Sequence, residues 1–429
     1  MSSIKQNGSN TRIHAKDEFD HRSMENEKAW PNMKSALLDA PNEETASLTV
    51  ELIPASDRNW IAPLWIALEE KCQPVRLSAR WTWVSTWLDV FGDTVPHWFA
   101  VAHCNGIPVG TCLVTCTGPW LLRQRGTGVI KIGTTGEPLG HSIATEYNDI
   151  LVDDHYRLDF AKELLHAIRR ELRPFAISLP AFSRQAIDPF IRADESFTQV
   201  DERCPVFELE LARNRGAEPI SLLRSSVRAR LRRSLRELQP YQTEWASTVE
   251  QADDILDELI DLHQRRWMKA GRIGAFSSDR FQAFHRALVP KLLAEERVVL
   301  FRLRQGSSTV GTLYSFIDNG DILFYQSGFA QFEDNKIRPG LTTHLLCIDE
   351  CLARGYTTYN FLSGEQRYKD ELSTTSEMLI NAQAPGYRAL APLVHYAYRP
   401  DVRERMRTIK HFGERVMLMS AREHRRDPV

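Results

Sequence analysis

The sequence contains no apolar run close to the roughly 20 residues that a transmembrane helix needs. It also has little net charge, formally −2 over 429 residues, so no bulk electrostatic field attracts it to nucleic acid or to a membrane surface. The amino-terminal stretch lacks the apolar core of a signal peptide. These absences predict a cytoplasmic protein without a membrane span and without a DNA partner.

Cysteine is scarce and odd in number, with 7 in the chain, which argues against a disulfide framework. No C-x-x-C or H-x-x-x-H spacing occurs, and no Ser-His-Asp or Cys-His motif stands out. We therefore expect no metal site and no covalent intermediate. Cys347 and Cys351, four residues apart on a predicted helix, are interpreted as core residues.

The chain is too long for one ordinary core, and its apolar fraction of 42% and charged fraction of 26% are typical of globular domains. Residues 1–47 are polar and without periodicity, which predicts a disordered arm. The arginine-rich residues 399–429 are predicted to form a basic helix that docks on the surface. Two domains are expected between these two ends.

Both halves of the intervening sequence carry the same order of predicted elements. Asn105-Gly106 and Asn319-Gly320 each separate two β-rich runs, which is a strong hairpin signal. Helices precede each hairpin, and a strand, a crossover helix and a further strand follow it; the first crossover is expected to leave from a strand at 144–152. The sequence therefore predicts a mixed α/β fold of two tandem units, at 48–215 and 241–398, with parallel crossover strands.

An arginine-rich segment, residues 216–240, joins the two units and carries six arginines between positions 224 and 236. One interpretation is a helix that binds nucleic acid or phosphate. The other is an amphipathic linker helix with solvated arginines, whose apolar side would comprise Leu222, Leu231, Leu235 and Leu238. The near-zero net charge and the lack of an RNA-binding aromatic motif favour the linker.

The predicted helix at 340–354 begins in an unusual way. Most helices open on a capping side chain with carboxylates in the first turn, but here the sequence reads Lys336, Ile337, Arg338, Pro339, Gly340 and Leu341. Because the first amides of a helix are unpaired and its dipole is positive there, this start suits an anion. We expect these six residues to bind phosphate; the alternative is that Pro-Gly only shapes a loop. The equivalent helix of the first unit opens on Asp153 and Asp154, whose charges would repel phosphate.

The patterns G-x-G-x-x-G and G-x-x-x-x-G-K-[ST] are absent at this turn, which weakens NAD and nucleoside triphosphates as ligands. A diphosphate held between a β-meander and one helix favours coenzyme A instead. If the ligand is an acyl-CoA, the reaction is attack by an amine on a thioester, and the amine must first lose a proton.

Several motifs occur in an order that resembles the GNAT acyltransferases, and in particular their CelD-like and FemAB-like double-GNAT branch. They are Trp83 to Trp87 (W-x-x-x-W), the arginine-rich helix, Arg265-Arg266-Trp267, Pro339-Gly340 and the closing segment YNFLSGEQRYKDELS at 359–373. Two positions depart from the family pattern. Thr342 or Thr343 stands where a second small residue is common, and Asn360 stands where an aspartate is common.

The resemblance implies an acyl-CoA-dependent N-acyltransferase, with acetyl-CoA as the expected donor and a small-molecule or saccharide amine as acceptor. It associates the protein with exopolysaccharide or cell-envelope biosynthesis. Two alternatives stay open: a FemAB-like transferase that uses aminoacyl-tRNA, and a non-catalytic scaffold for polysaccharide synthesis. The internal pairing of the units predicts a monomer or weak dimer.

The segment 363–371 follows the last predicted strand, at the edge where open α/β sheets place ligands. We expect Tyr368 to protonate the departing thiolate or to form a hydrogen bond with the substrate, and Glu365 or Asp370 to act as the base toward the amine. Lys369 would bind an anionic group, and further substrate contacts are expected from Arg266, Trp267, Tyr325 and Gln326. The competing interpretation is a solvated charged loop.

Overall fold

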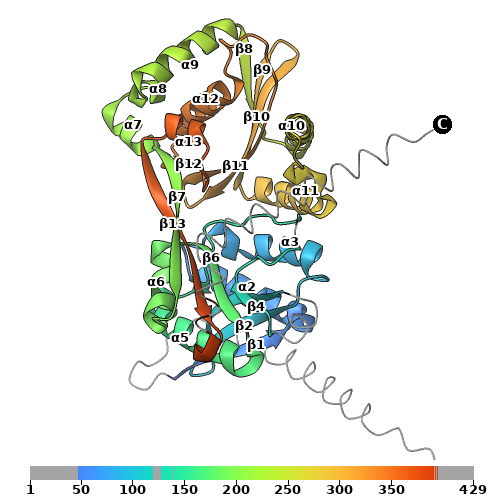
Figure 1. Ribbon diagram of the computed structural model, residues 1–429, viewed down its shortest axis with the longest axis vertical. Helices are drawn as coiled ribbons and strands as arrows, with labels where there is room; N and C mark the ends of the chain where they lie inside the picture. The colour runs from blue at the N-terminus through green and yellow to red at the C-terminus, as the bar shows by residue number, and fades with distance from the viewer. Residues whose placement is uncertain (1–46, 119–126, 139, 391, 393, 395–429) are drawn as a thin grey trace, which may run out of the picture.

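Figure 1 shows a computed structural model of the protein, in which residues 47–118, 127–138, 140–390, 392 and 394 are described. The predicted arm, apart from its last residue, and the predicted basic helix at 399–429 lie outside these ranges. The described residues form one mixed sheet of 13 strands with helices on both faces. The α/β class and the tandem arrangement predicted from the sequence are confirmed.

The two units contribute equivalent strands in the same order. Those of the first unit are β1 (Leu48–Pro54), β2 (His97–Cys104), β3 (Ile107–Thr117), β4 (Val129–Ile132), β6 (Ala176–Ser183) and β7 (Thr198–Glu208), with the short β5 (Leu151–Val152) beside β3. Those of the second unit are β8 (Tyr241–Trp245), β9 (Val298–Gln305), β10 (Ser308–Asp318), β11 (Asp321–Phe329), β12 (Thr358–Asn360) and β13 (Thr375–Pro385).

The last strand of each unit lies in the sheet of the other. From one edge the order is β1-β2-β3-β4-β6-β13, and from the opposite edge it is β8-β9-β10-β11-β12-β7. β7 and β13 pair with each other where the two series meet, and Figure 1 shows them running together between the units. The proposed boundaries at 48–215 and 241–398 therefore describe the order along the chain rather than two separable bodies.

Both predicted hairpins are present. Asn105 and Gly106 join β2 to β3, and Asn319 and Gly320 join β10 to β11. All four residues have positive φ, between 52° and 89°, which is the conformation that Asn-Gly turns favour. In each unit the crossover strands are parallel, β4 with β6 and β11 with β12.

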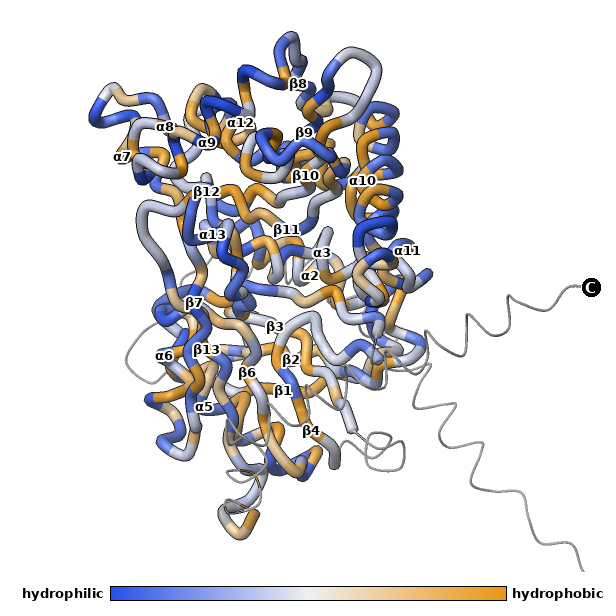
Figure 2. The backbone as a smooth tube through the Cα atoms, turned by 45° about the horizontal axis from the view of Figure 1, so that its top comes forward, coloured by the Kyte–Doolittle hydropathy of each residue, from blue (hydrophilic) through white to orange (hydrophobic). Residues whose placement is uncertain are grey.

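Helices from both units share one core on one face of the sheet. These helices are α2 (Arg58–Lys71), α3 (Trp81–Phe91), α10 (Val249–Lys269) and α11 (Asp279–Ala294). Trp83 of α3 packs edge-on against Phe284 of α11 and Phe316 of β10, with ring centroids 5.3 and 5.2 Å apart. Figure 2 shows α10 alternating between hydrophobic and hydrophilic residues along its turns, as expected for a helix with one buried side.

The opposite face is covered separately in each unit. In the first unit it is covered by α5 (Arg157–Ala167), continued by a π-helical turn (Ile168–Leu172), and by α6 (Arg184–Ala193). In the second unit it is covered by α7 (Leu209–Arg215), α8 (Pro219–Leu222), α9 (Ser225–Glu237), α12 (Pro339–Ala353) and α13 (Arg367–Leu372). α9 buries Val227, Leu231 and Ser234, while Arg232 and Arg233 are exposed. The α9 helix is therefore amphipathic, with these arginines on its solvent side.

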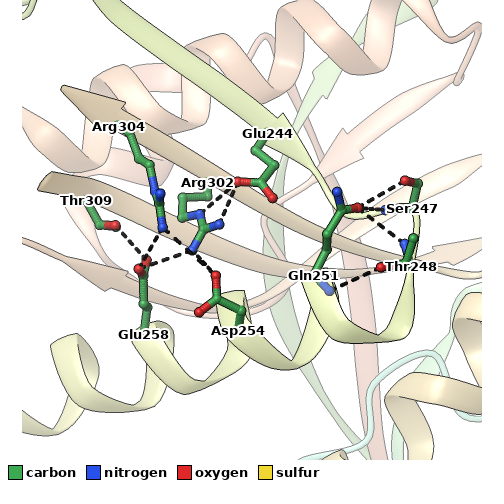
Figure 3. Close-up of polar contacts among 9 residues, drawn as sticks. All are labelled: Glu244, Ser247, Thr248, Gln251, Asp254, Glu258, Arg302, Arg304 and Thr309. Carbon is green, nitrogen blue, oxygen red and sulfur yellow. Dashed lines mark hydrogen bonds and ion pairs between the residues drawn. The ribbon is translucent and has the colours of Figure 1, made fainter. Parts of the chain in front are cut away.

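An ion-pair network fixes the outer edge of the second unit (Figure 3). Arg302 of β9 is only 3% exposed, and its guanidinium lies 2.6 Å from Glu244 of β8 and 2.7 and 3.1 Å from Asp254 and Glu258 of α10. α10 itself begins with a capping box at Thr248. Because a buried charge is tolerated only when it is paired, this network holds α10 against the sheet.

Several sequence expectations were wrong in detail. Only Leu151–Val152 of the strand expected at 144–152 is extended, and the strand that enters the first crossover is β4. β4 has four residues and includes Lys131, so it carried little pattern to recognise. The segment expected to be a loop at 363–371 contains most of the short helix α13.

Candidate active site

The candidate site begins at the α12 start, residues Lys336–Leu341. The residue before the helix, Arg338, makes no side-chain cap, and the first turn contains no acidic residue. Pro339 has no N–H to donate. The next two amides, of Gly340 and Leu341, have no hydrogen-bond partner among the described residues, whereas the Thr342 amide donates to the Arg338 carbonyl at 2.9 Å. Two free amides therefore stand at the positive end of a 15-residue helix.

The helix α9 holds this start in place. The buried Ser234 hydroxyl accepts a hydrogen bond from the Arg338 amide at 2.8 Å and another from the Thr342 hydroxyl at 2.8 Å. Lys336 lies 4.0 Å from carboxylate oxygens of both Glu237 and Asp334, so its charge is partly balanced. Ile337 packs its side chain against the small apolar cluster around Leu303. Arg338 is exposed and forms no ion pair within the described ranges.

The corresponding position in the first unit is already occupied by acidic side chains. The Asp153 carboxylate accepts the His155 amide at 3.1 Å, and Arg157 at the start of α5 pairs with Asp154 at 3.1 Å and Asp149 at 2.6 Å. A phosphate would meet three carboxylates there. This contrast supports the expectation of a single anion site, in the second unit.

β11 and β12 diverge next to the α12 start. They pair only from Asp321 to Leu323, so the rest of β11 has no partner on that side. A register shift against β10 also leaves Tyr325 as a β-bulge, a feature that commonly re-aims backbone groups near active sites. In the first unit Asn148 closes the equivalent position. Its backbone N–H donates to the Ala181 carbonyl at 3.1 Å, and its side-chain amide donates to the Pro180 carbonyl at 2.8 Å, both on β6.

Aromatic side chains line the wedge between β11 and β12 on the side of α12. We call this the His344 cluster; it comprises His344 and the rings of Phe324, Phe329, Tyr359, Phe361 and Tyr368. His344 is fully buried, and its Nδ1 lies 2.9 Å from the Tyr359 hydroxyl. Its Nε2 has no partner in the described part of the chain. Burial lowers the pKa of His344 to about 3, so the imidazole is neutral.

Tyr368 stacks on His344 with centroids 5.4 Å apart and planes 20° apart. Burial raises the pKa of Tyr368 to about 12, although the nearby Arg266 charge acts in the opposite direction. Tyr368 therefore keeps its proton at neutral pH. Arg266 is exposed and forms no ion pair with any described residue. The neighbouring Trp267 is held by a 2.9 Å hydrogen bond to His263 Nε2.

Two residues of the predicted catalytic segment have structural partners. Asp370 forms a surface ion pair with Arg203, and both side chains are exposed. Lys369 is 6% exposed and donates to the carbonyls of Leu362 and Ser363 at 3.2 and 2.6 Å. Lys369 is thus a buried lysine held by two backbone carbonyls, and the expectation that it binds an anionic group stays a prediction. Glu365 is exposed.

The first unit reaches into this region through a buried polar cluster. The Glu146 carboxylate accepts hydrogen bonds from the Ser363 amide and hydroxyl, and burial raises the pKa of Glu146. Asn360 donates to the Tyr147 hydroxyl at 2.6 Å and to Glu377 at 3.3 Å. Asn360 therefore acts as a structural amide where the family pattern has an acid.

Tyr325 also faces the first unit. Its hydroxyl donates to the Ile143 carbonyl at 2.7 Å, and it lines a cavity of about 20 Å³ together with Glu146 and Asp318. That volume holds about one water molecule. The Tyr325 hydroxyl is thus held by the first unit, and the expectation that Tyr325 lines an acceptor channel stays a prediction. Gln326, the next residue, is half-buried and pairs with Tyr314.

Comparisons with known proteins agree with this geometry. Residues 225–370 match the family model described as "Acetyltransferase (GNAT) domain". A search of curated protein sequences found no match. Among solved structures, FemX aligns with a TM-score of 0.51 at 8% identity, covering 78% of this chain and 96% of that chain.

Two further structures align less closely. L-PGS from Bacillus licheniformis has a TM-score of 0.48 at 12% identity, over 78% of this chain and 94% of that chain. A tandem GNAT protein from the clavulanic acid biosynthesis pathway has a TM-score of 0.41 at 11% identity, over 80% of this chain and 99% of that chain.

Residues 225–370, which include most of the second unit, are therefore similar to GNAT acetyltransferase domains. The chain as a whole has a fold similar to that of FemX. None of its described helices is long and apolar enough to cross a membrane, and none of the described His, Cys, Asp and Glu side chains form a group of three suited to a metal ion.

Proposed function

We propose that the protein is an acyl-CoA-dependent N-acyltransferase, with acetyl-CoA as its expected donor and its active site in the second unit. The observation that carries the proposal is the pair of free amides at Gly340 and Leu341, beside strands that diverge. Backbone amides at a helix start are natural ligands of a diphosphate. Gly340 suits this role because a side chain there would already lie 3.2 Å from the Phe329 ring.

The proposed reaction is a direct transfer. The amine nitrogen attacks the thioester carbonyl, the C–N bond forms and the C–S bond breaks. Backbone N–H groups near the Tyr325 bulge on β11 would stabilise the oxyanion. Tyr368, protonated at neutral pH, gives its proton to the departing thiolate. Asp370 is occupied by Arg203, so Glu365 is the remaining carboxylate of the two proposed from the sequence to accept the amine proton.

The acceptor is proposed to be an amine on a small molecule or saccharide. Arg266, which is exposed and unpaired among the described residues, and Trp267 lie at the end of α10, where they would close the acceptor site. The CelD-like resemblance connects such an acceptor with exopolysaccharide or cell-envelope biosynthesis.

One observation favours a second candidate, transfer from aminoacyl-tRNA. Four exposed arginines on and before α9, next to the α12 start, form no ion pair with described residues; they are Arg224, Arg232, Arg233 and Arg236. Such a surface suits a phosphate backbone as well as a coenzyme.

Titration calorimetry with acetyl-CoA, set against a gel-shift assay with bulk tRNA, tests the proposal. We expect saturable acetyl-CoA binding and, at 100 times Kd, about 2.7 kcal/mol of added stability. A tRNA shift without acetyl-CoA binding would replace the first candidate by the second. Binding of neither ligand would favour the non-catalytic scaffold.

A further inference from the structure

We infer that His344 is a ligand-binding residue, whose Nε2–H donates a hydrogen bond to a carbonyl oxygen of the acyl donor in the wedge between β11 and β12. The inference rests on the proposed function and deepens it. His344 would bind the acyl-carrying arm of the donor, whereas the α12 start would bind its phosphates.

The first step is the proton on the imidazole. The Tyr359 hydroxyl has one proton to donate, and it forms a 2.9 Å hydrogen bond with His344 Nδ1. If Nδ1 accepts that proton, the neutral ring carries its own hydrogen on Nε2. Nε2–H is then a buried donor with no acceptor among the described residues.

The second step is energetic. An unsatisfied buried donor costs about 1–3 kcal/mol, and buried polar atoms are paired in the great majority of cases. The His344 cluster is otherwise aromatic, and a phenylalanine would fill the same space without this cost. A ligand that supplies an acceptor atom accounts for the histidine.

The third step is position. His344 lies on the second turn of α12, just inside the α12 start. Its ring contacts Phe324 of β11 at 4.5 Å between centroids, and Phe361, which follows β12, at 5.4 Å. The imidazole therefore lies on the α12 side of the sheet, next to side chains of both diverging strands. A thioester arm that leaves the α12 start and enters this wedge passes the ring.

A second buried histidine provides the contrast. His285 of α11 is equally buried, but both of its ring nitrogens have partners, Nδ1 with the Tyr314 hydroxyl and Nε2 with the Tyr325 hydroxyl, each at 3.1 Å. These bonds connect to the Ile143 carbonyl through Tyr325. His285 is a structural residue and serves as the matched control.

The test compares His344→Phe with His285→Phe in the full chain, using titration calorimetry with coenzyme A and with acetyl-CoA and thermal unfolding. We expect His344→Phe to unfold at the same or a higher temperature but to bind at least about tenfold more weakly, the loss of about one hydrogen bond. His285→Phe should unfold at a lower temperature and bind normally. His344→Gln, which keeps a donor, should recover part of the affinity.

The two ligands identify the acceptor. If His344→Phe binds both ligands more weakly, the hydrogen bond is assigned to an amide carbonyl that they share. If it binds only acetyl-CoA more weakly, the hydrogen bond is assigned to the thioester carbonyl. A wild type that binds neither ligand overturns the proposed function and this inference with it. Normal binding by His344→Phe overturns this inference alone. If that variant does not fold, the Nε2 resonance of wild-type His344 decides: a shift on adding coenzyme A supports the role, and no shift with either ligand refutes it.

Discussion

Glu146 of the first unit accepts two hydrogen bonds from Ser363 of the second, from its amide at 2.9 Å and from its hydroxyl at 2.8 Å. Ser363 lies between β12 and the helix that carries Tyr368. The first unit therefore supports the segment that follows β12 in the second unit.

This contact predicts a specific pH dependence of stability. Burial raises the pKa of Glu146 above its ordinary value of 4.5, so the folded state binds this proton more tightly than the unfolded state. The stabilising contribution is present at low pH and is lost as the pH rises from about 4.5 toward the raised pKa. As the pH rises over this range, urea unfolding should show that the wild type loses stability relative to Glu146→Gln. Glu365→Gln, a change at an exposed carboxylate, is the control. The prediction would be contradicted if the free energy of unfolding of wild type relative to Glu146→Gln depended on pH no more than that relative to Glu365→Gln.

Gly340→Asp should separate ligand binding from stability. An aspartate in the first turn interacts favourably with the helix dipole, by about 0.3–1 kcal/mol, whereas its Cβ would lie 3.2 Å from the Phe329 ring. Because Gly340→Ala shares that contact, the thermal midpoint of Gly340→Asp should equal or exceed that of Gly340→Ala. The same charge repels a diphosphate, and coenzyme A should bind at least about tenfold more weakly, as measured by calorimetry. Gly340→Ala adds bulk without charge and is the control. Unchanged affinity in Gly340→Asp would exclude the α12 start as the phosphate site.

Tyr368→Phe should lower kcat by about 10²–10⁴-fold, the usual contribution of a general acid, with little change in the KM for acyl-CoA. The Tyr368 hydroxyl has no partner among the described residues, so unfolding should change little. Steady-state kinetics and thermal unfolding are the measurements. The exposed Tyr387→Phe, at the far end of β13, should leave both unchanged. A large loss of stability with no change in kcat would make Tyr368 a structural residue.

Asn360→Asp should destabilise the protein even though an aspartate is common in the family at this position. The change removes the amide that donates to Tyr147 and places a carboxylate about 3.3 Å from Glu377. A cost of about 1–3 kcal/mol is expected in chemical unfolding. Adding Glu377→Gln should restore part of it, because the like charge is removed. Additive losses in the double variant would refute this repulsion.

Local signals in the sequence predicted the parts of the fold that depend on neighbouring residues. The Asn-Gly hairpins, the Trp-rich helix α3 and the uncapped start of α12 are each determined by residues that lie within a few positions of one another. β7 and β13 were missed because their partners are far away in the chain. Each has a solvent-exposed polar half, so neither shows the apolar alternation of a typical strand.

The candidate site was only partly predictable for the same reason. Lys369 and Asp370 are adjacent and both charged, yet one is buried beneath a loop and the other pairs with Arg203. Only the tertiary fold distinguishes them. His344 did carry a signal, since it is a histidine on the buried side of a helix that also buries Cys347, Ile348 and Cys351.

The exchange of β7 and β13 has a consequence for synthesis of the chain. The first unit cannot complete its sheet until residues 375–385 have left the ribosome, because β13 separates β6 from β7. Until then β6 presents an open strand edge, a surface that invites pairing with other chains. The two units therefore complete their folding together. A chain that ended between them would lack β13 and could not complete the sheet of the first unit.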